Sequence, residues 1–290
     1  MAQTRSDTSC LDKETVALMA HIVQVGAGSG GIVVLDLICR DPRVTRITLI
    51  EPDVYKEHNV ERHYFPRSAV GRPKAELAQE WVRAFRPDLP VEILRYDLTD
   101  PAIQDRIEAA AASATVGVCA VDNEPAKYFW DALMRKHRKP WTLGEVLSGG
   151  IGGFVHRFRP EGPCYGCVAS FLKREVQEQQ PTAVDYSQPG GPVYEVTIPA
   201  SKASVHAIAS LHAVATLQAL DGDGPSWDDV TTVLLSLQRV ENVFEQAFRS
   251  HRFPIPRSAE CLICQPRPEG IPAQDLDEAL DRALAQFGDA

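Results

Sequence analysis

The chain has 290 residues, nearly twice the ~150 residues of an average domain, so we expect one large domain or a domain with a substantial appendage. Its 44% hydrophobic and 24% charged residues exclude disordered and fibrous classes. No run approaches ~18 uninterrupted apolar residues, and the polar N-terminus lacks the apolar core of a signal peptide. We therefore expect a cytoplasmic protein without membrane contact. The formal charge of −9 argues against nucleic-acid binding, which needs a basic face.

Strand and helix patterns alternate over the first 145 residues. Short apolar runs predict strands at residues 21–25, 46–50, 91–96 and 115–121. Helical patterns lie between and after them, at residues 32–40, 70–86, 101–112 and 125–138. Such alternation is typical of a mostly parallel, Rossmann-like α/β sheet with helices on both faces.

The pattern changes after about residue 145. Residues 152–158 (GGFVHRF) predict an antiparallel strand, and residues 230–240 predict a further strand. Residues 177–192 are rich in Gln, Pro and Gly and poor in large apolar residues, so we expect a mobile crossing segment there. An Ala-rich buried helix at residues 201–220 and an amphipathic helix at residues 274–287 complete the prediction.

A glycine-rich turn follows the first predicted strand. Gly26, Gly28 and Gly31 form a G-x-G-x-x-G register between a strand and a helix, and Glu51 ends the next strand 20 residues after the last glycine. Such glycines permit a tight turn and a close approach of the backbone to phosphate oxygens. Glu51 is placed to accept hydrogen bonds from ribose hydroxyls. We predict a nucleotide-binding turn, the alternative being a glycine-rich turn in a non-binding α/β fold.

Polar and cationic residues follow Glu51 in a pattern that suits a triphosphate better than NAD. Arg62 and Lys74 are candidates to reach the β- and γ-phosphates, and Asn59 is a candidate for the ribose–α-phosphate region. Asp122 follows a predicted strand and is a candidate Mg²⁺ ligand, since this cation favours carboxylate and phosphate oxygens. Taken singly, each residue could equally be a solvated loop group.

Seven cysteines are present, and four of them form two Cys-x-x-Cys pairs, Cys164/Cys167 and Cys261/Cys264. Disulfides are not expected in the cytoplasm. Four thiolates are the ligands of a closed, tetrahedral structural zinc site. Because 93 residues separate the pairs, the metal would join two distant segments. A redox role for one pair is the alternative, but it leaves the other pair unexplained.

As a set, these motifs resemble those of the ThiF/MoeB family of adenylating enzymes, which is related to the ubiquitin-activating enzymes. The shared order is G-x-G-x-x-G, acid-x-Asp, Asn-x-x-Arg, Gly-x-x-Lys, Asp-Asn and two Cys-x-x-Cys pairs, over about residues 18–267. The resemblance gives ribose and substrate contacts to Glu51 and Asp53, ATP-phosphate contacts to Asn59, Arg62 and Lys74, a Mg²⁺-binding or catalytic role to Asp122, and zinc ligation to Cys164, Cys167, Cys261 and Cys264.

The resemblance also implies a domain organisation. The adenylation domain spans residues 18–267, with a nucleotide-binding half at 18–145 and a substrate and zinc half at 146–267 that contains the crossing segment at 177–200. A flexible arm at residues 1–17 precedes it, and a helix at residues 268–290 follows it. Family members are typically homodimers, and the small-residue helix from Ser201 is a candidate interface, although burial within one chain is the stronger reading.

Four features depart from the family pattern. Glu51 replaces the commoner Asp, His63 stands where Gln is common, and Lys127 stands where an Arg is common. The N-terminal Arg-Tyr-x-Arg-Gln helix is absent, and Arg5 does not align with it. Completion of the site by an arginine of the dimer partner is therefore not implied.

Cysteine placement bears on the reaction. Relatives that transfer the acyl group to their own thiol carry that cysteine in the crossing segment, but no cysteine lies between Cys167 and Cys261. Cys39 falls in a predicted helix and Cys119 in a predicted strand, so both are expected to pack in the core. Cys10 on the N-terminal arm remains the candidate thiol. We therefore expect an acyl-adenylate product, with thiol chemistry left to a partner.

The implied reaction is ATP- and Mg²⁺-dependent adenylation of the C-terminal carboxylate of a ubiquitin-like or sulfur-carrier protein that ends in Gly-Gly. The activated protein would pass to a ubiquitin-conjugating-type enzyme or a sulfurtransferase acceptor. Alternatives are adenylation of a peptide C-terminus in antibiotic-type biosynthesis, a non-catalytic subunit that binds a ubiquitin-like protein, and an NAD-dependent oxidoreductase.

Overall fold

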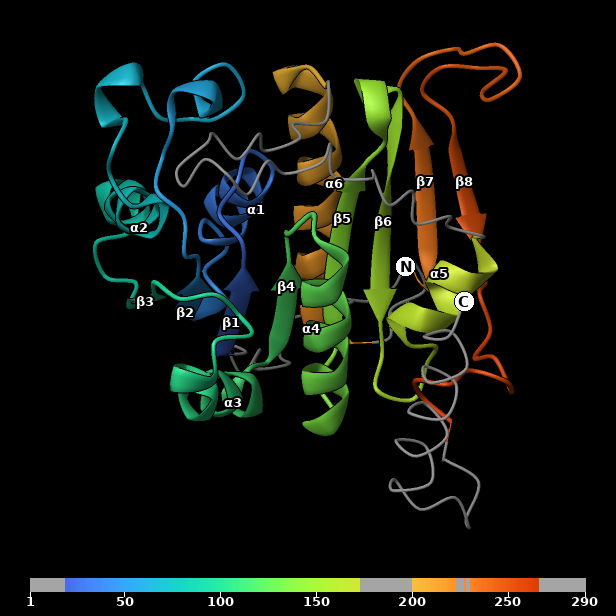
Figure 1. The fold of residues 1–290 in the computed structure, drawn as a ribbon, viewed down its shortest axis with the longest axis horizontal. Helices are drawn as coiled ribbons and strands as arrows, with labels where there is room; N and C mark the ends of the chain where they lie inside the picture. Colours follow the sequence, from blue (N-terminus) through green and yellow to red (C-terminus); the bar gives the residue numbers. More distant parts are fainter. Residues whose placement is uncertain (1–18, 173–199, 223–226, 228–229, 266–290) are drawn as a thin grey trace, which may run out of the picture.

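One eight-stranded sheet organises the protein in the computed structural model, which describes residues 19–172, 200–222, 227 and 230–265 (Figure 1). The predicted arm at 1–17, the segment at 177–192 and the helix at 274–287 lie outside the described residues, as do Arg5 and Cys10. The strand order is β3-β2-β1-β4-β5-β6-β7-β8. The strands are β1 Ala20–Val25, β2 Val44–Ile50, β3 Val91–Leu94, β4 Val116–Cys119, β5 Trp141–Val146, β6 Gly152–Phe158, β7 Thr232–Ser236 and β8 Ser250–Phe253.

The sheet has a parallel part and an antiparallel part. Strands β1 to β5 pair in parallel in the order 3-2-1-4-5, which is the Rossmann order. Strands β5 to β8 pair antiparallel. The predicted α/β fold and its antiparallel extension are both confirmed. In a sheet of this order, ligands bind beyond the carboxyl ends of the strands at the switch point, here between β1 and β4.

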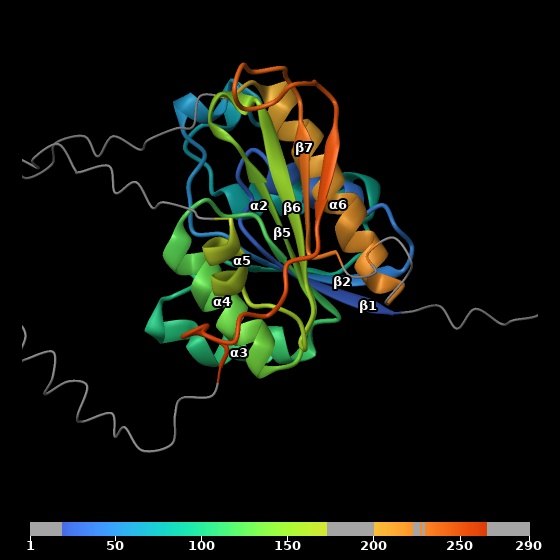
Figure 2. The same cartoon turned by 90° about the vertical axis from the view of Figure 1, so that its right-hand side faces the viewer.

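Helices cover both faces of the sheet (Figures 1 and 2). Along β1 the side chains alternate, so Ile22 packs in one apolar cluster with α1, α2 and α6, whereas Val23 packs in the other with α3, α4 and α5. Because both faces are covered, all six residues of β1 are buried. The helices are α1 Gly31–Ile38, α2 Lys74–Phe85, α3 Gln104–Ser113, α4 Glu124–Lys136, α5 Tyr165–Phe171 and α6 Lys202–Leu220.

Several predicted boundaries were wrong. Helix α2 begins at Lys74 instead of residue 70, because Gly71 has φ +92° and Pro73 occupies the N-cap position. Strand β7 is shorter than the predicted 230–240. Two strands and one α-helix of the described residues were missed. Strand β5 has a Gly-Glu interruption, α5 contains poor helix formers, and β8 (SHRF) is a polar edge strand.

Helix α6 packs across the sheet against α1, β5 and β6. Among the described residues it is the one helix long and apolar enough to cross a membrane, and 56% of that stretch is buried inside the fold. Contact with the sheet accounts for its apolar composition, which confirms the predicted burial of this helix. Its first turn lies beside the glycine turn, since the Cβ of an alanine at Gly30 would be 3.7 Å from both Val205 and Ala209.

Candidate active site

The glycine turn is closed at two of its glycines and open at the third. Gly26 has φ +90°, and a Cβ there would lie 2.5 Å from the carbonyl oxygen of Ala120. A Cβ at Gly31 would lie 2.4 Å from the Gly26 carbonyl oxygen. A Cβ at Gly28 would meet no heavy atom within 4 Å. Gly26 and Gly31 therefore serve the packing of strand, turn and helix, whereas Gly28 leaves the backbone accessible to a ligand.

Two buried side chains brace this turn. Gln24 on β1, which the sequence analysis did not single out, donates from Nε2 to the carbonyl oxygens of Gly26 and Gly31, both at 2.8 Å. Glu51 at the end of β2 is 4% exposed. Its Oε2 accepts from the Ala27 amide at 2.6 Å and its Oε1 from the Asp53 amide at 2.9 Å. Burial raises the pKa of Glu51, although Lys74 and the two amides oppose this shift.

Glu51 retains capacity for a ligand. A carboxylate offers about four acceptor positions, and the two amides take two of them. Its role toward ribose, expected from its place after the glycine motif and from the resemblance, stays a prediction.

The structure brings Lys74 and Asp53 together. Lys74 is the first residue of α2 and is 7% exposed. Its Nζ lies 2.8 Å from Asp53 Oδ2, and its amide donates to the Asp53 carbonyl oxygen at 2.9 Å. A cation is unfavourable at a helix N-terminus, where the helix dipole is already positive, so the Asp53 carboxylate compensates both charges. The result is a buried ammonium group that is paired with Asp53 and lies close enough to Glu51 to oppose the rise in the pKa of that carboxyl group. Its role toward ATP stays a prediction.

Asn59, Arg62 and Asp122 lie on the loops around the site. Asn59 ends the short 3-10 helix η1 (Glu57–Asn59), and its Oδ1 accepts from the Lys56 amide at 2.8 Å. The Arg62 backbone bonds to the ring of His206 on α6. Asp122 is exposed and stands two residues after Ala120, whose carbonyl oxygen borders Gly26. The roles of these three residues toward ATP and Mg²⁺ stay predictions.

His63 and Lys202 connect α6 to the glycine turn. His63 is 1% exposed, and its Nε2 lies 2.9 Å from the Ala27 carbonyl oxygen. Burial lowers the pKa of His63 to about 4, so the ring is neutral at pH 7 and donates through Nε2. Lys202, at the start of α6, donates to the His63 carbonyl oxygen at 2.9 Å. The sequence marked His63 only as a departure from Gln and gave no signal for Lys202, because that contact spans 139 residues.

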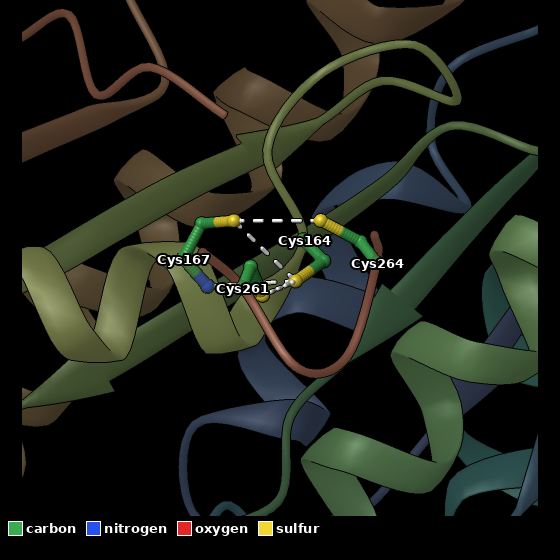
Figure 3. Close-up of side chains that lie close together, drawn as sticks. All are labelled: Cys164, Cys167, Cys261 and Cys264. Carbon is green, nitrogen blue, oxygen red and sulfur yellow. Dashed lines mark hydrogen bonds between the residues drawn. The ribbon is translucent and has the colours of Figure 1, made fainter. Parts of the chain in front are cut away.

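The four paired cysteines gather in one cluster (Figure 3). Their sulfur atoms all lie within 4.8 Å of one another, with Cys164 Sγ 3.7 Å from Cys167 Sγ and 3.5 Å from Cys261 Sγ, and with Cys167 Sγ 3.6 Å from Cys264 Sγ. A tetrahedron with Zn–S bonds of ~2.3 Å has sulfur–sulfur edges of about 3.8 Å, so the cluster could hold zinc.

Burial and neighbouring amides shift the pKa values of these thiols in opposite directions. Burial raises the pKa of Cys164. Burial opposes ionisation of Cys261 as well, but the amides of Cys264 and Ile263 outweigh it and lower its pKa to about 7. A divalent cation would bind all four sulfurs as thiolates.

Cys39 and Cys119 are packed in the core, as predicted. Both are 0% exposed, and burial raises the pKa of each thiol to about 12. Neither is therefore available as a nucleophile near neutral pH.

The ThiF family profile matches residues 8–263. The chain belongs to the ThiF family. Its relatives include the "SAMP-activating enzyme E1" of Haloferax volcanii, 28% identical over 152 residues that cover 52% of this chain and 54% of the relative. The "sulfur carrier protein adenylyltransferase" of Thermus thermophilus is 30% identical over 154 residues, which cover 51% of this chain and 55% of the relative. The chain thus spans about half the length of the curated relatives it matches.

Solved structures share the fold. The microcin C7 biosynthetic enzyme MccB in complex with N-formylated MccA has a TM-score of 0.66 at 15% identity, over 86% of this chain and 69% of that one. E. coli MccB with ATP has a TM-score of 0.63 at 16% identity, over 86% of this chain and 68% of that one. At such identities the likeness concerns the fold alone. The names of these two relatives describe an activating enzyme and an adenylyltransferase.

Proposed function

We propose that this protein uses ATP and Mg²⁺ to adenylate the C-terminal carboxylate of a ubiquitin-like or sulfur-carrier protein, releasing pyrophosphate. The observation that carries the proposal is the buried Lys74 ammonium group beside a glycine turn that is open at Gly28. The names of the two relatives support it, since one is a SAMP-activating enzyme and the other a sulfur carrier protein adenylyltransferase. Adenylation activates a carboxylate by turning it into a mixed anhydride with AMP.

The chemistry requires positioning more than acid–base catalysis. A C-terminal carboxyl group has a pKa of ~3.5 and is ionised at neutral pH, so no general base is needed. The obstacle is to bring this anion to the α-phosphorus of a polyanion. Lys74 and Arg62 would bind the phosphates, and Asn59 and Glu51 would hold the ribose side of the nucleotide. Asp122 would hold Mg²⁺, which supplies charge neutralisation to the leaving pyrophosphate.

Zinc would have an architectural role at the cysteine cluster. The cluster joins the start of α5 to the segment after β8, so a bound metal would fasten the end of the antiparallel extension to the helical layer. The proposed enzyme acts as a homodimer in the cytoplasm. It passes the activated protein to a conjugating enzyme or a sulfurtransferase.

ATP–pyrophosphate exchange tests the proposed function. Wild-type protein should catalyse the exchange with MgATP when a carrier protein with a Gly-Gly end is supplied. Lys74→Ala should lower the rate roughly 10²–10³-fold, since one preorganised charge contact is lost. Lys136→Ala is the matched control, because Lys136 lies on the exposed surface of α4 in an ion pair with Glu108. Equal exchange by Lys74→Ala and wild type would remove this site assignment.

The exchange assay also identifies the substrate. The first candidates to supply in it are small proteins that co-purify with the chain in the presence of ATP and are identified by mass spectrometry. Exchange supported by a short peptide in place of a carrier protein would favour the peptide-modifying alternative. A protein that binds NADH and shows no Mg²⁺-dependent ATP binding would favour the oxidoreductase.

A further inference from the structure

A polar cluster, buried except at the one-third exposed Glu124 side chain, joins the cysteine cluster to the loop that carries Asp122. Tyr165, the first residue of α5 and the neighbour of Cys164, is 0% exposed. Its hydroxyl donates to Glu124 Oε2 at 2.8 Å, and its amide donates to Asp131 Oδ1 at 3.2 Å. Both acceptors belong to α4, so α5 is attached to α4 at two points seven residues apart.

Glu124 is held on a second side by Lys127. The Lys127 side chain is 5% exposed, and its Nζ lies 2.6 Å from Glu124 Oε1 and 2.7 Å from Glu145 Oε1 on β5. Burial alone would lower the pKa of Lys127, but the Glu145 and Glu124 carboxylates outweigh this effect, so the net pKa is raised. The lysine therefore stays charged between two carboxylates.

The cluster continues into the antiparallel extension. Glu145 Oε2 lies 2.8 Å from His156 Nε2 on β6, and His156 Nδ1 lies 2.8 Å from Thr232 Oγ1 on β7. Glu124 thus receives support from α5 through Tyr165 and from three neighbouring strands through Lys127. The buried members Tyr165, Lys127 and His156 hold this geometry, since each polar group of theirs left without a partner would cost free energy.

The position of Glu124 gives this support a function. Glu124 is the first residue of α4, and Asn123 caps the helix by accepting from the Ala126 amide at 2.8 Å. Asp122 directly precedes this cap. Fixing the Glu124 side chain therefore fixes the start of α4 and limits where the exposed Asp122 carboxylate can lie.

We infer that Tyr165 and Glu124 are positioning residues that hold Asp122 for the Mg²⁺–nucleotide complex. The inference rests on the proposed function, in which Asp122 binds Mg²⁺. It assigns the neighbour of the cysteine cluster a role in nucleotide binding, in addition to any architectural role. Neither residue is required to touch ATP.

Tyr165→Phe isolates the link, because it removes the hydroxyl and keeps the ring that packs against Phe158 and Tyr128. The expected result is wild-type zinc content together with an about tenfold increase in the Mg²⁺ concentration that half-saturates ATP binding, measured by calorimetry. Amide hydrogen exchange over residues 123–127 should accelerate in the nucleotide-free protein. Tyr96→Phe, at an exposed position after β3, is the control and should change neither.

Glu124→Gln and the double variant complete a cycle. If the hydrogen bond carries the effect, the double variant should be no worse than the more impaired single variant. The inference would be overturned if the effects of the two single variants on Mg²⁺ dependence multiplied in the double variant. It would also be overturned if Tyr165→Phe lost stability while its Mg²⁺ dependence and its amide hydrogen exchange stayed unchanged. Wild-type protein without MgATP binding would refute the proposed function, and hydrogen exchange would still decide whether the bond holds the loop.

Discussion

His63 makes the stability of the glycine turn sensitive to pH. Its ring is buried against Tyr55 and Phe65, and its Nε2–H donates to the Ala27 carbonyl oxygen. In the part of the chain that the structure describes, Nδ1 has no hydrogen-bond partner. A second proton would therefore place an unpaired charge in the core, close to Lys74 and Lys202.

The size of the effect follows from the pKa. Burial lowers it from an ordinary value of 6.5 to about 4. As the pH falls through 6.5 the unfolded chain binds the proton first, so the folded state loses stability until about pH 4. At ~1.4 kcal/mol for each pH unit, the loss at His63 amounts to about 3 kcal/mol. Stability from this residue is thus fully present above pH 6.5.

Substitution of His63 by Gln should remove this dependence. The Gln amide can donate to the Ala27 carbonyl oxygen, as Nε2 does, and it does not titrate. Urea unfolding at several pH values between 4 and 7.5 measures the difference in unfolding free energy between variant and wild type. This difference should move in favour of His63→Gln by about 3 kcal/mol from pH 7.5 to pH 4.

Two comparisons make the measurement decisive. His212 is also buried, and burial lowers its pKa to about 4. Wild type and His63→Gln should therefore both keep the loss of stability in acid that comes from His212. His251→Gln on the edge strand β8 controls for the introduction of a glutamine in place of a histidine. Parallel curves for His63→Gln and wild type would refute the reasoning, because they would show that the ring titrates equally in both states.

The remaining predictions concern the glycine turn and the cysteine cluster. Gly31→Ala should lower the free energy of unfolding by about 1–3 kcal/mol, since its methyl group would overlap the Gly26 carbonyl oxygen. Gly28→Ala should change the free energy of unfolding by less than about 0.5 kcal/mol but weaken ATP binding. Equal thermal unfolding of Gly31→Ala and Gly28→Ala would contradict the argument that Gly31 is closed by packing and Gly28 is open. Cys164→Ser should lose bound zinc and unfold at a lower temperature, because metal binding to four thiolates is coupled to folding. A variant as stable as the wild type, with no metal in either protein, would contradict a structural zinc site.

Local patterns predicted the parallel part of the sheet well. The sequence around Gly26, Gly28 and Gly31 defines a strand, a turn and a helix, and the structure has them at Ala20–Val25, at the glycines and at Gly31–Ile38. The two Cys-x-x-Cys pairs were expected to meet, because four soft ligands suit one metal, and they do meet. Strand β8 was missed because a short polar edge strand is stabilised by its ladder with β7 rather than by side-chain burial.

Contacts between distant residues were outside the reach of sequence patterns. His63 was noticed only because it replaces a common Gln, and its burial under α6 depends on packing. Tyr165 looked like an ordinary residue inside a Cys-x-x-Cys pair, although its hydroxyl reaches Glu124, 41 residues away. Such pairs form only after the chain has folded, because side-chain distances across helices are set by how the layers pack.

The amino-acid order alone determined the chemistry that this protein can offer: glycines free to turn, an acid after the second strand, ammonium and guanidinium groups, and four paired thiols. Residue type and local spacing decide these properties. The folded chain alone decided which of these groups lie in low dielectric and which face solvent. Lys74 is paired and buried, His63 is held neutral, and Lys127 is kept charged because burial and neighbouring groups set the free energy of each ionisation.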